Sequence, residues 1–132
     1  MTFVDRVTRC IVGWRVALQV NDDLLQALAD EAHQAHWYYS DALPAYQDLA
    51  FDFGTHFAMH DKSQTYSVEA DNAELRHYLA RLGRKSRCFS RCLDALRAAV
   101  TLFVYCWNSR QLYKQTYPHY PSHLFEFLCP VF

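Results

Sequence analysis

The sequence predicts one α/β domain, and three observations support this class. The chain has 132 residues, the size of one ordinary domain. Its hydrophobic fraction of 52% and aromatic fraction of 16% suffice for a packed core. Strand-like and helix-like segments mix along it in the order strand, strand, helix, strand, helix, strand, helix, helix. No internal repeat, low-complexity block or second domain is visible in the sequence.

The first part of the chain predicts two strands and a helix. Thr2–Val4 is β-prone, residues 5–8 are polar enough to turn, and residues 9–18 are rich in β-branched and aromatic side chains. Asn21 supplies a helix cap, and two aspartates favour the first turn that follows it. Leucines then recur at helical spacing, which predicts an amphipathic helix over residues 22–34.

The middle of the chain predicts two more strands, a short helix and a longer one. The aromatic run at residues 36–39 suits a buried parallel strand. Residues 43–49 should form a short helix with a proline in its first turn, and another strand is expected at residues 56–60. From about Val68 the leucine spacing is helical, and Gly83 should end this helix.

The last part predicts one long helix and a tail. Residues 90–111 are apolar on most helix faces, so this helix should be buried. The tail, residues 117–132, holds three of the four prolines and many aromatic side chains. We expect it to lie extended across the surface.

Cysteine usage and hydropathy indicate the compartment. The five cysteines are odd in number and irregularly spaced, and the N-terminus lacks the apolar region of a secretory signal. The longest apolar run, residues 98–107, is far shorter than the roughly 20 residues of a membrane span. We therefore expect a soluble cytoplasmic protein with free thiols and no membrane partner.

The net charge of −1 gives no sign of a nucleic-acid partner, so the local distribution of charge matters more.

Asp41 is the first candidate site residue. It directly follows the strand expected at residues 36–39, and ligand groups collect at the carboxyl ends of strands in open α/β sheets. An equally good interpretation is that Asp41 caps the helix that begins near Leu43. The residue by itself does not choose between these two roles.

Glu69 is the second candidate, and it lies in the first turn of the helix expected from Val68. Negative charge there is favourable in itself. Asn72 and Arg76 follow three and seven positions later, so at ~3.6 residues per turn all three lie on one helix face. A carboxylate, an amide and a guanidinium so aligned resemble a metal site flanked by a phosphate contact. An ordinary solvated face remains the alternative.

Basic residues accumulate after this point and predict a DNA-binding segment. From Arg76 to Arg91 no Asp or Glu interrupts the run, and aromatic side chains are interleaved. The basic residues that follow the first one are Arg81, Arg84, Lys85, Arg87 and Arg91. A solvated basic face without a partner is the alternative.

Three segments resemble a known family. The run from Glu69 to Ser86, which contains HYLARLGRKS, and the CFS at residues 88–90 resemble the C-terminal signature of transposases of the insertion sequence one family. Upstream, VDRVTRCIVGW at residues 4–14 resembles the second and third strands of that family's catalytic domain. YYSDALPAY at residues 38–46 resembles the segment with its second catalytic Asp. The resemblance covers about residues 2–115.

This resemblance implies an activity and its site residues. It implies a ribonuclease-H-like α/β fold with a DDE triad, in which Asp41 matches the second Asp and Glu69 the catalytic Glu. Arg76 matches the basic residue seven positions later. The carboxylates of such a site hold two Mg²⁺ ions ~3.5–4 Å apart for phosphoryl transfer. DNA, as insertion-sequence ends and target, is then the partner, and the protein is associated with the nucleoid.

The chain departs from the family pattern in one respect. The family's first catalytic Asp lies on its first strand, and the matching segments here start at the second strand. We therefore expect a partial catalytic domain at residues 1–116, a separate tail at 117–132, and a truncated chain that is inactive alone. Uncovered strand edges would reduce its solubility and favour a homo-oligomer.

Three hypotheses for the function follow. The chain is a transposase subunit that cuts and joins DNA with Mg²⁺, a catalytically dead remnant that binds DNA through its basic helix, or a plain α/β interaction protein. Salt-dependent binding to duplex DNA separates the second from the third.

Overall fold

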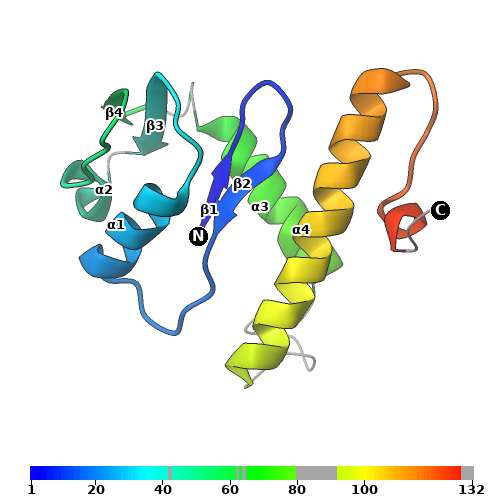
Figure 1. The fold of residues 1–132 in the computed structure, drawn as a ribbon, viewed down its shortest axis with the longest axis horizontal. Helices are drawn as coiled ribbons and strands as arrows, with labels where there is room; N and C mark the ends of the chain where they lie inside the picture. Colours follow the sequence, from blue (N-terminus) through cyan, green and yellow to red (C-terminus); the bar gives the residue numbers. More distant parts are fainter. Residues whose placement is uncertain (42, 62, 64, 80–91, 129–132) are drawn as a thin grey trace. The chain divides into compact units, whose positions relative to one another are not determined.

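A computed structural model describes residues 1–41, 43–61, 63, 65–79 and 92–128 (Figure 1). Helices and strands mix along the chain, which confirms the α/β class. The chain divides into two compact units. We call Met1–Phe3 with Val12–Asn72 the first unit, and Val4–Ile11 with Ala73–Phe132 the second unit. No pattern in the sequence indicates this division.

Helix α1, Asp22–Glu31, is the main helix of the first unit. As predicted, Asn21 caps it, because its Oδ1 accepts a hydrogen bond from the Leu24 amide at 2.9 Å. The leucine face is buried, which confirms the amphipathic pattern. The helix ends three residues before the predicted end. The backbone amide of Ala35 donates instead to the Tyr38 hydroxyl at 2.7 Å, so the chain leaves the helix to start the next strand.

Strands β3, Trp37–Asp41, and β4, Thr55–Met59, pair in parallel in the first unit, with Trp37 opposite Thr55 and Asp41 opposite Met59. Helix α2, Pro44–Gln47, lies in the connection between them. The parallel pairing is confirmed.

The expectation that strand β3 is buried is wrong, because successive side chains of a strand point to opposite faces of the sheet. Tyr38 stacks on Phe51 with ring centroids 3.9 Å apart, whereas Trp37 on the other face is 66% exposed. Within the described ranges, β3 pairs with β4 and with no third strand.

Strands β1, Thr2–Val4, and β2, Ile11–Trp14, form a second two-stranded sheet (Figure 1). Met1 and Arg15 exchange backbone hydrogen bonds, and the Asp5 amide donates to the Cys10 carbonyl at 2.9 Å, so the strands run antiparallel. The strand predicted at residues 9–18 is therefore shorter than expected.

The predicted turn at residues 5–8 is confirmed in the second unit. The Asp5 carboxylate accepts hydrogen bonds from the amides of Val7 and Thr8 and from the Thr8 hydroxyl. The bond from the Thr8 side chain is the main reason why the pKa of Asp5 is lowered. Arg9, at the end of the loop, has a positive φ of 61°.

Helix α3, Tyr66–Tyr78, begins two residues before the predicted start at Val68. The buried Thr65 precedes it, and its carbonyl accepts the amides of Val68 and Glu69. The predicted end at Gly83 lies outside the described residues.

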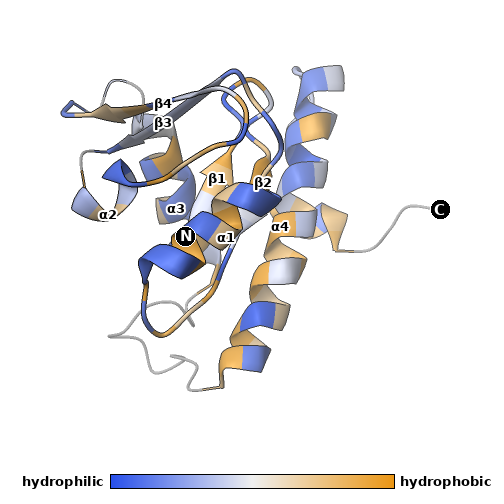
Figure 2. Ribbon diagram, turned by 60° about the vertical axis from the view of Figure 1, so that its left-hand side comes forward, coloured by the Kyte–Doolittle hydropathy of each residue, from blue (hydrophilic) through white to orange (hydrophobic). Residues whose placement is uncertain are grey.

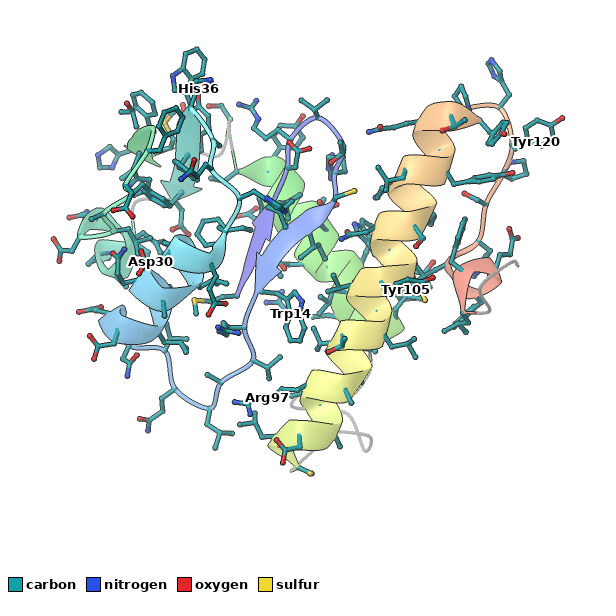
Figure 3. All side chains as sticks on the ribbon, in the orientation of Figure 1. Trp14, Asp30, His36, Arg97, Tyr105 and Tyr120 are labelled. Atoms are coloured by element: carbon teal, nitrogen blue, oxygen red, sulfur yellow. The ribbon has the colours of Figure 1, made fainter. Side chains whose placement is uncertain are left out.

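Helix α4, Leu93–Thr116, organises the second unit. One stripe of it is buried, at Leu96, Val100, Phe103, Cys106 and Trp107. The expectation of burial on most faces is wrong, because Leu102, Tyr105 and Leu112 are each about half exposed. Apolar and polar residues alternate along this helix in Figure 2, and Figure 3 labels the exposed Tyr105. Among the described helices, none combines the length and the apolar character that a membrane crossing requires.

Two side chains of α4 bind the backbone around the N-terminal turn. Asn108 accepts from the Ile11 amide at 2.7 Å and donates to the Ile11 carbonyl at 2.9 Å. The Trp107 indole N–H donates to the Arg9 carbonyl at 3.0 Å. These three bonds give hydrogen-bond partners to backbone groups of Arg9 and Ile11.

The tail is not extended throughout, which corrects the prediction. Residues Leu124–Phe127 form a 3-10 helix, η2, and Leu124 is 4% exposed. The thiol of Cys106 donates to the Phe127 carbonyl at 3.4 Å, and the Tyr113 and Phe127 rings lie 5.7 Å apart. The aromatic side chains therefore pack this segment against α4 within the second unit.

Candidate functional site

Asp41 ends strand β3 and is exposed. Its carboxylate accepts the Leu43 amide at 3.3 Å, directly before α2. The pKa of Tyr46 is raised by burial and, to a smaller extent, by the charge of Asp41. The prediction that Asp41 caps α2 is wrong, because Leu43 is the N-cap and this helix has no side-chain cap hydrogen bond; Asp41 bonds only the amide of that cap residue. Its charge does lie at the carboxyl end of a parallel strand, where ligand groups collect.

A hydrogen-bonded pair lies beside Asp41. The Ser40 hydroxyl donates to the Asp41 carbonyl at 3.0 Å, and its oxygen lies 2.8 Å from His56 Nε2 on β4. Burial lowers the pKa of His56, so the neutral imidazole is favoured there. The pair links the two parallel strands at the end that carries Asp41. The sequence did not indicate this link, since only the strand register brings residues 40 and 56 together.

Glu69 and Asn72 lie on the first-unit part of α3. Glu69 is in the first turn, as predicted, and its side chain is exposed. Asn72 Oδ1 accepts a hydrogen bond from the Thr2 hydroxyl at 2.9 Å. Asn72 thus ties α3 to strand β1 at a point three residues after Glu69.

The predicted DNA-binding residues fall largely outside the described ranges. Arg76 is exposed in the last turn of α3. Five others lie in the part of the chain that the structure does not describe: Arg81, Arg84, Lys85, Arg87 and Arg91.

Two carboxylates could serve as ligands of a divalent metal ion. Asp41 and Glu69 offer carboxylate oxygens, the hard ligands that Mg²⁺ prefers. However, the described residues contain no group of three or more His, Cys, Asp and Glu side chains that could hold a metal ion. These two carboxylates therefore do not form a complete metal site with other described residues.

These features define a mixed α/β protein with exposed carboxylates at a strand end and at a helix start. Comparison with protein families gives a match to the IS1 transposase family over residues 4–108. This match covers most of the chain, so the chain belongs to the IS1 transposase family. The family indicates a role in DNA transposition, with DNA as a partner. No curated protein and no solved structure matches the chain.

Proposed function

We propose that the protein acts in metal-dependent cleavage and transfer of DNA strands during transposition of an insertion sequence. The family match over residues 4–108 carries this proposal, because it includes both Asp41 and Glu69. Asp41 at the end of a parallel strand and Glu69 at a helix start are the two carboxylates that we assign to the catalytic site.

The fold that we propose is the ribonuclease-H-like core of DDE transposases over residues 1–116, followed by the tail at 117–132. The order of elements supports it: the β1–β2 hairpin comes first, α1 follows, and the parallel pair β3–β4 precedes α3. The hairpin contains the segment that resembles the family's second and third strands. We also propose that the protein works at the nucleoid in the cytoplasm.

Mg²⁺ is the cofactor that we propose. Bound Mg²⁺ supplies activation of the attacking oxygen and stabilisation of the leaving oxygen in phosphoryl transfer. Asp41 and Glu69 would contribute ligands to it, and Asn72, three residues after Glu69, ties α3 to strand β1 through Thr2. With two of the three family carboxylates matched, we propose that metal binding is weak and that this chain alone does not catalyse strand transfer.

The second candidate function is DNA binding without catalysis. The absence of a three-ligand group among the described residues favours it. Arg76 and the five basic residues Arg81, Arg84, Lys85, Arg87 and Arg91 would then contact phosphates without sequence preference.

The DNA-binding prediction is tested with the 132-residue chain and labelled duplex DNA that carries insertion-sequence ends. We expect binding that weakens steeply as salt rises, because released counterions drive it. We expect no joined strands with Mg²⁺ or Mn²⁺. Fluorescence anisotropy measures binding, and denaturing gels detect transfer. Turnover by this chain would contradict its proposed inactivity, and no binding at low salt would overturn the DNA role.

The metal prediction concerns the two carboxylates. We expect Asp41→Asn and Glu69→Gln each to weaken Mn²⁺ binding by at least about tenfold, the loss that even an outer-sphere partner can cause. Electron paramagnetic resonance of free Mn²⁺ gives the affinity. Asp23→Asn is the matched control, since Asp23 is an exposed acid in the first turn of α1. Equal weakening by all three variants would show that Mn²⁺ only follows the overall negative charge.

A further inference from the structure

One face of the β3–β4 pair is aromatic and exposed, and we call it the aromatic face. The two strands lie side by side in the first unit (Figure 1). Trp37 is 66% exposed and Phe57 is 42% exposed. Large aromatic side chains are usually well buried, so two exposed ones on one sheet face mark a surface that is available to a partner. The β3 side chains on this face and their register partners on β4 are Trp37, Tyr39, Asp41, Thr55, Phe57 and Met59.

Two rings of the aromatic face already stack on each other. The Tyr39 and Phe57 centroids lie 5.6 Å apart, and the ring planes differ by 20°. Such near-parallel packing across neighbouring strands restricts the orientation of the exposed Phe57 ring. Trp37 lies two residues before Tyr39, ~7 Å along the strand. The face therefore offers flat ring surfaces before any ligand arrives.

The charge of these strands decides which part of a DNA molecule fits here. Strands β3 and β4 contain no Lys or Arg, and Asp41 places a negative charge at the end of the face. DNA phosphates bind through cations, so the DNA backbone is not attracted to these side chains. The neutral, planar part of DNA is the base, and aromatic side chains bind bases by stacking.

The position of Asp41 gives a reason for DNA bases to come near these rings. We assign Asp41 to the catalytic site, and it lies on the aromatic face two residues after Tyr39, ~7 Å along the strand. Stacked bases of one strand follow one another at ~3.4 Å. A strand whose phosphodiester lies at Asp41 therefore has its next few bases within reach of Tyr39, Phe57 and Trp37.

We propose that Trp37, Tyr39 and Phe57 form a stacking surface for unpaired bases of DNA beside Asp41. The proposal rests on the proposed role in DNA transposition. A base can offer its flat face to a protein ring only where the strand is unpaired or its stack is opened. Every base has such a face, so this surface binds single-stranded DNA with little sequence preference.

The test compares a single strand of deoxythymidines with a duplex of the same length, by fluorescence anisotropy at several salt concentrations. We expect Trp37→Ala to weaken single-strand binding by at least about fivefold at each salt concentration and to leave duplex binding unchanged. Because a stacked base releases no counterion, the slope of log affinity against log salt should stay the same. Tyr120→Ala is the matched control, since Tyr120, labelled in Figure 3, is also 66% exposed but belongs to the tail.

Trp37→Phe gives a second, independent measurement. It keeps an aromatic ring at this position, so most of the single-strand affinity should return. A base stacked on Trp37 should quench the tryptophan fluorescence of the unchanged chain, and this quenching should be lost in Trp37→Phe although the variant still binds. Trp107, 3% exposed, cannot stack on a base and does not contribute to the quenching. Melting temperatures show whether each variant is folded, and if Trp37→Ala unfolds, the quenching still decides.

Four results would contradict the stacking surface. Equal single-strand affinities of Trp37→Ala and Tyr120→Ala would overturn it, and duplex binding by the unchanged chain would leave the DNA role standing. Equal losses on both DNAs would contradict recognition of unpaired bases. A lower sedimentation mass of Trp37→Ala with unchanged DNA affinity would assign the aromatic face to a contact between copies of the chain. Failure of the unchanged chain to bind either DNA at low salt would overturn both proposals.

Discussion

Replacing Trp107 by alanine should reduce the free energy of unfolding by about 3–5 kcal/mol, the usual cost of removing a buried tryptophan. The side chain is 3% exposed, and it stacks near Phe103 with ring centroids 5.7 Å apart. The substitution also leaves the Arg9 carbonyl without its indole donor and Arg110 without its aromatic partner. Urea titration followed by circular dichroism measures the change.

The matched control for this prediction is Tyr105→Ala. Tyr105, labelled in Figure 3, lies two residues earlier on the same helix but is 53% exposed. Its removal should change the free energy of unfolding by about 0.5 kcal/mol or less. If the two variants are equally stable, the buried stripe of α4 has been assigned to the wrong face.

Replacing Gly54 by alanine should destabilise the first unit by about 2 kcal/mol or more. Gly54 has a φ of +87°, which residues other than glycine rarely adopt. A Cβ atom there would clash with the Ala35 carbonyl oxygen and lie 2.8 Å from the His36 oxygen. That His36 carbonyl accepts the Thr55 amide at the start of β4, so the clash falls where the parallel pair begins. Urea titration again gives the loss.

Gly13→Ala provides the comparison within the same unit. A Cβ atom at Gly13 would lie 3.4 Å from Leu28 Cδ1, a side-chain atom that can move. We expect a change within about 1 kcal/mol, because the backbone there has no positive φ. A larger loss for Gly13→Ala than for Gly54→Ala would contradict the turn geometry described before β4.

Charge is distributed unevenly between the two units. The first unit contains ten Asp and Glu residues against two Lys and Arg residues. The second unit contains eleven Lys and Arg residues against four Asp and Glu residues. The net charge of −1 hides this difference. The carboxylates Asp41 and Glu69 belong to the acidic unit, which suits cation binding. The phosphate contacts that we propose belong to the basic one.

The sequence predicted local structure well where one residue acts on its near neighbours. The Asn21 cap, the turn made by Asp5 and the position of Glu69 in a first helix turn all depend on bonds that span a few residues. Predicted boundaries were less accurate. The end of α1 depends on the Tyr38 hydroxyl, and the start of α3 depends on Thr65, neither of which the periodicity of leucines reveals.

The sequence by itself determined the α/β class, the order of the elements and, through its motifs, the family. The tertiary structure decided which side chains meet. The Asn108 amide reaches Ile11, 97 positions away in the chain, and the tail docks on α4 through Phe127. The aromatic face was not suggested by any sequence pattern, because it exists only where β3 pairs with β4. Local preferences are encoded residue by residue, whereas burial and long-range hydrogen bonds exist only once distant segments have packed together.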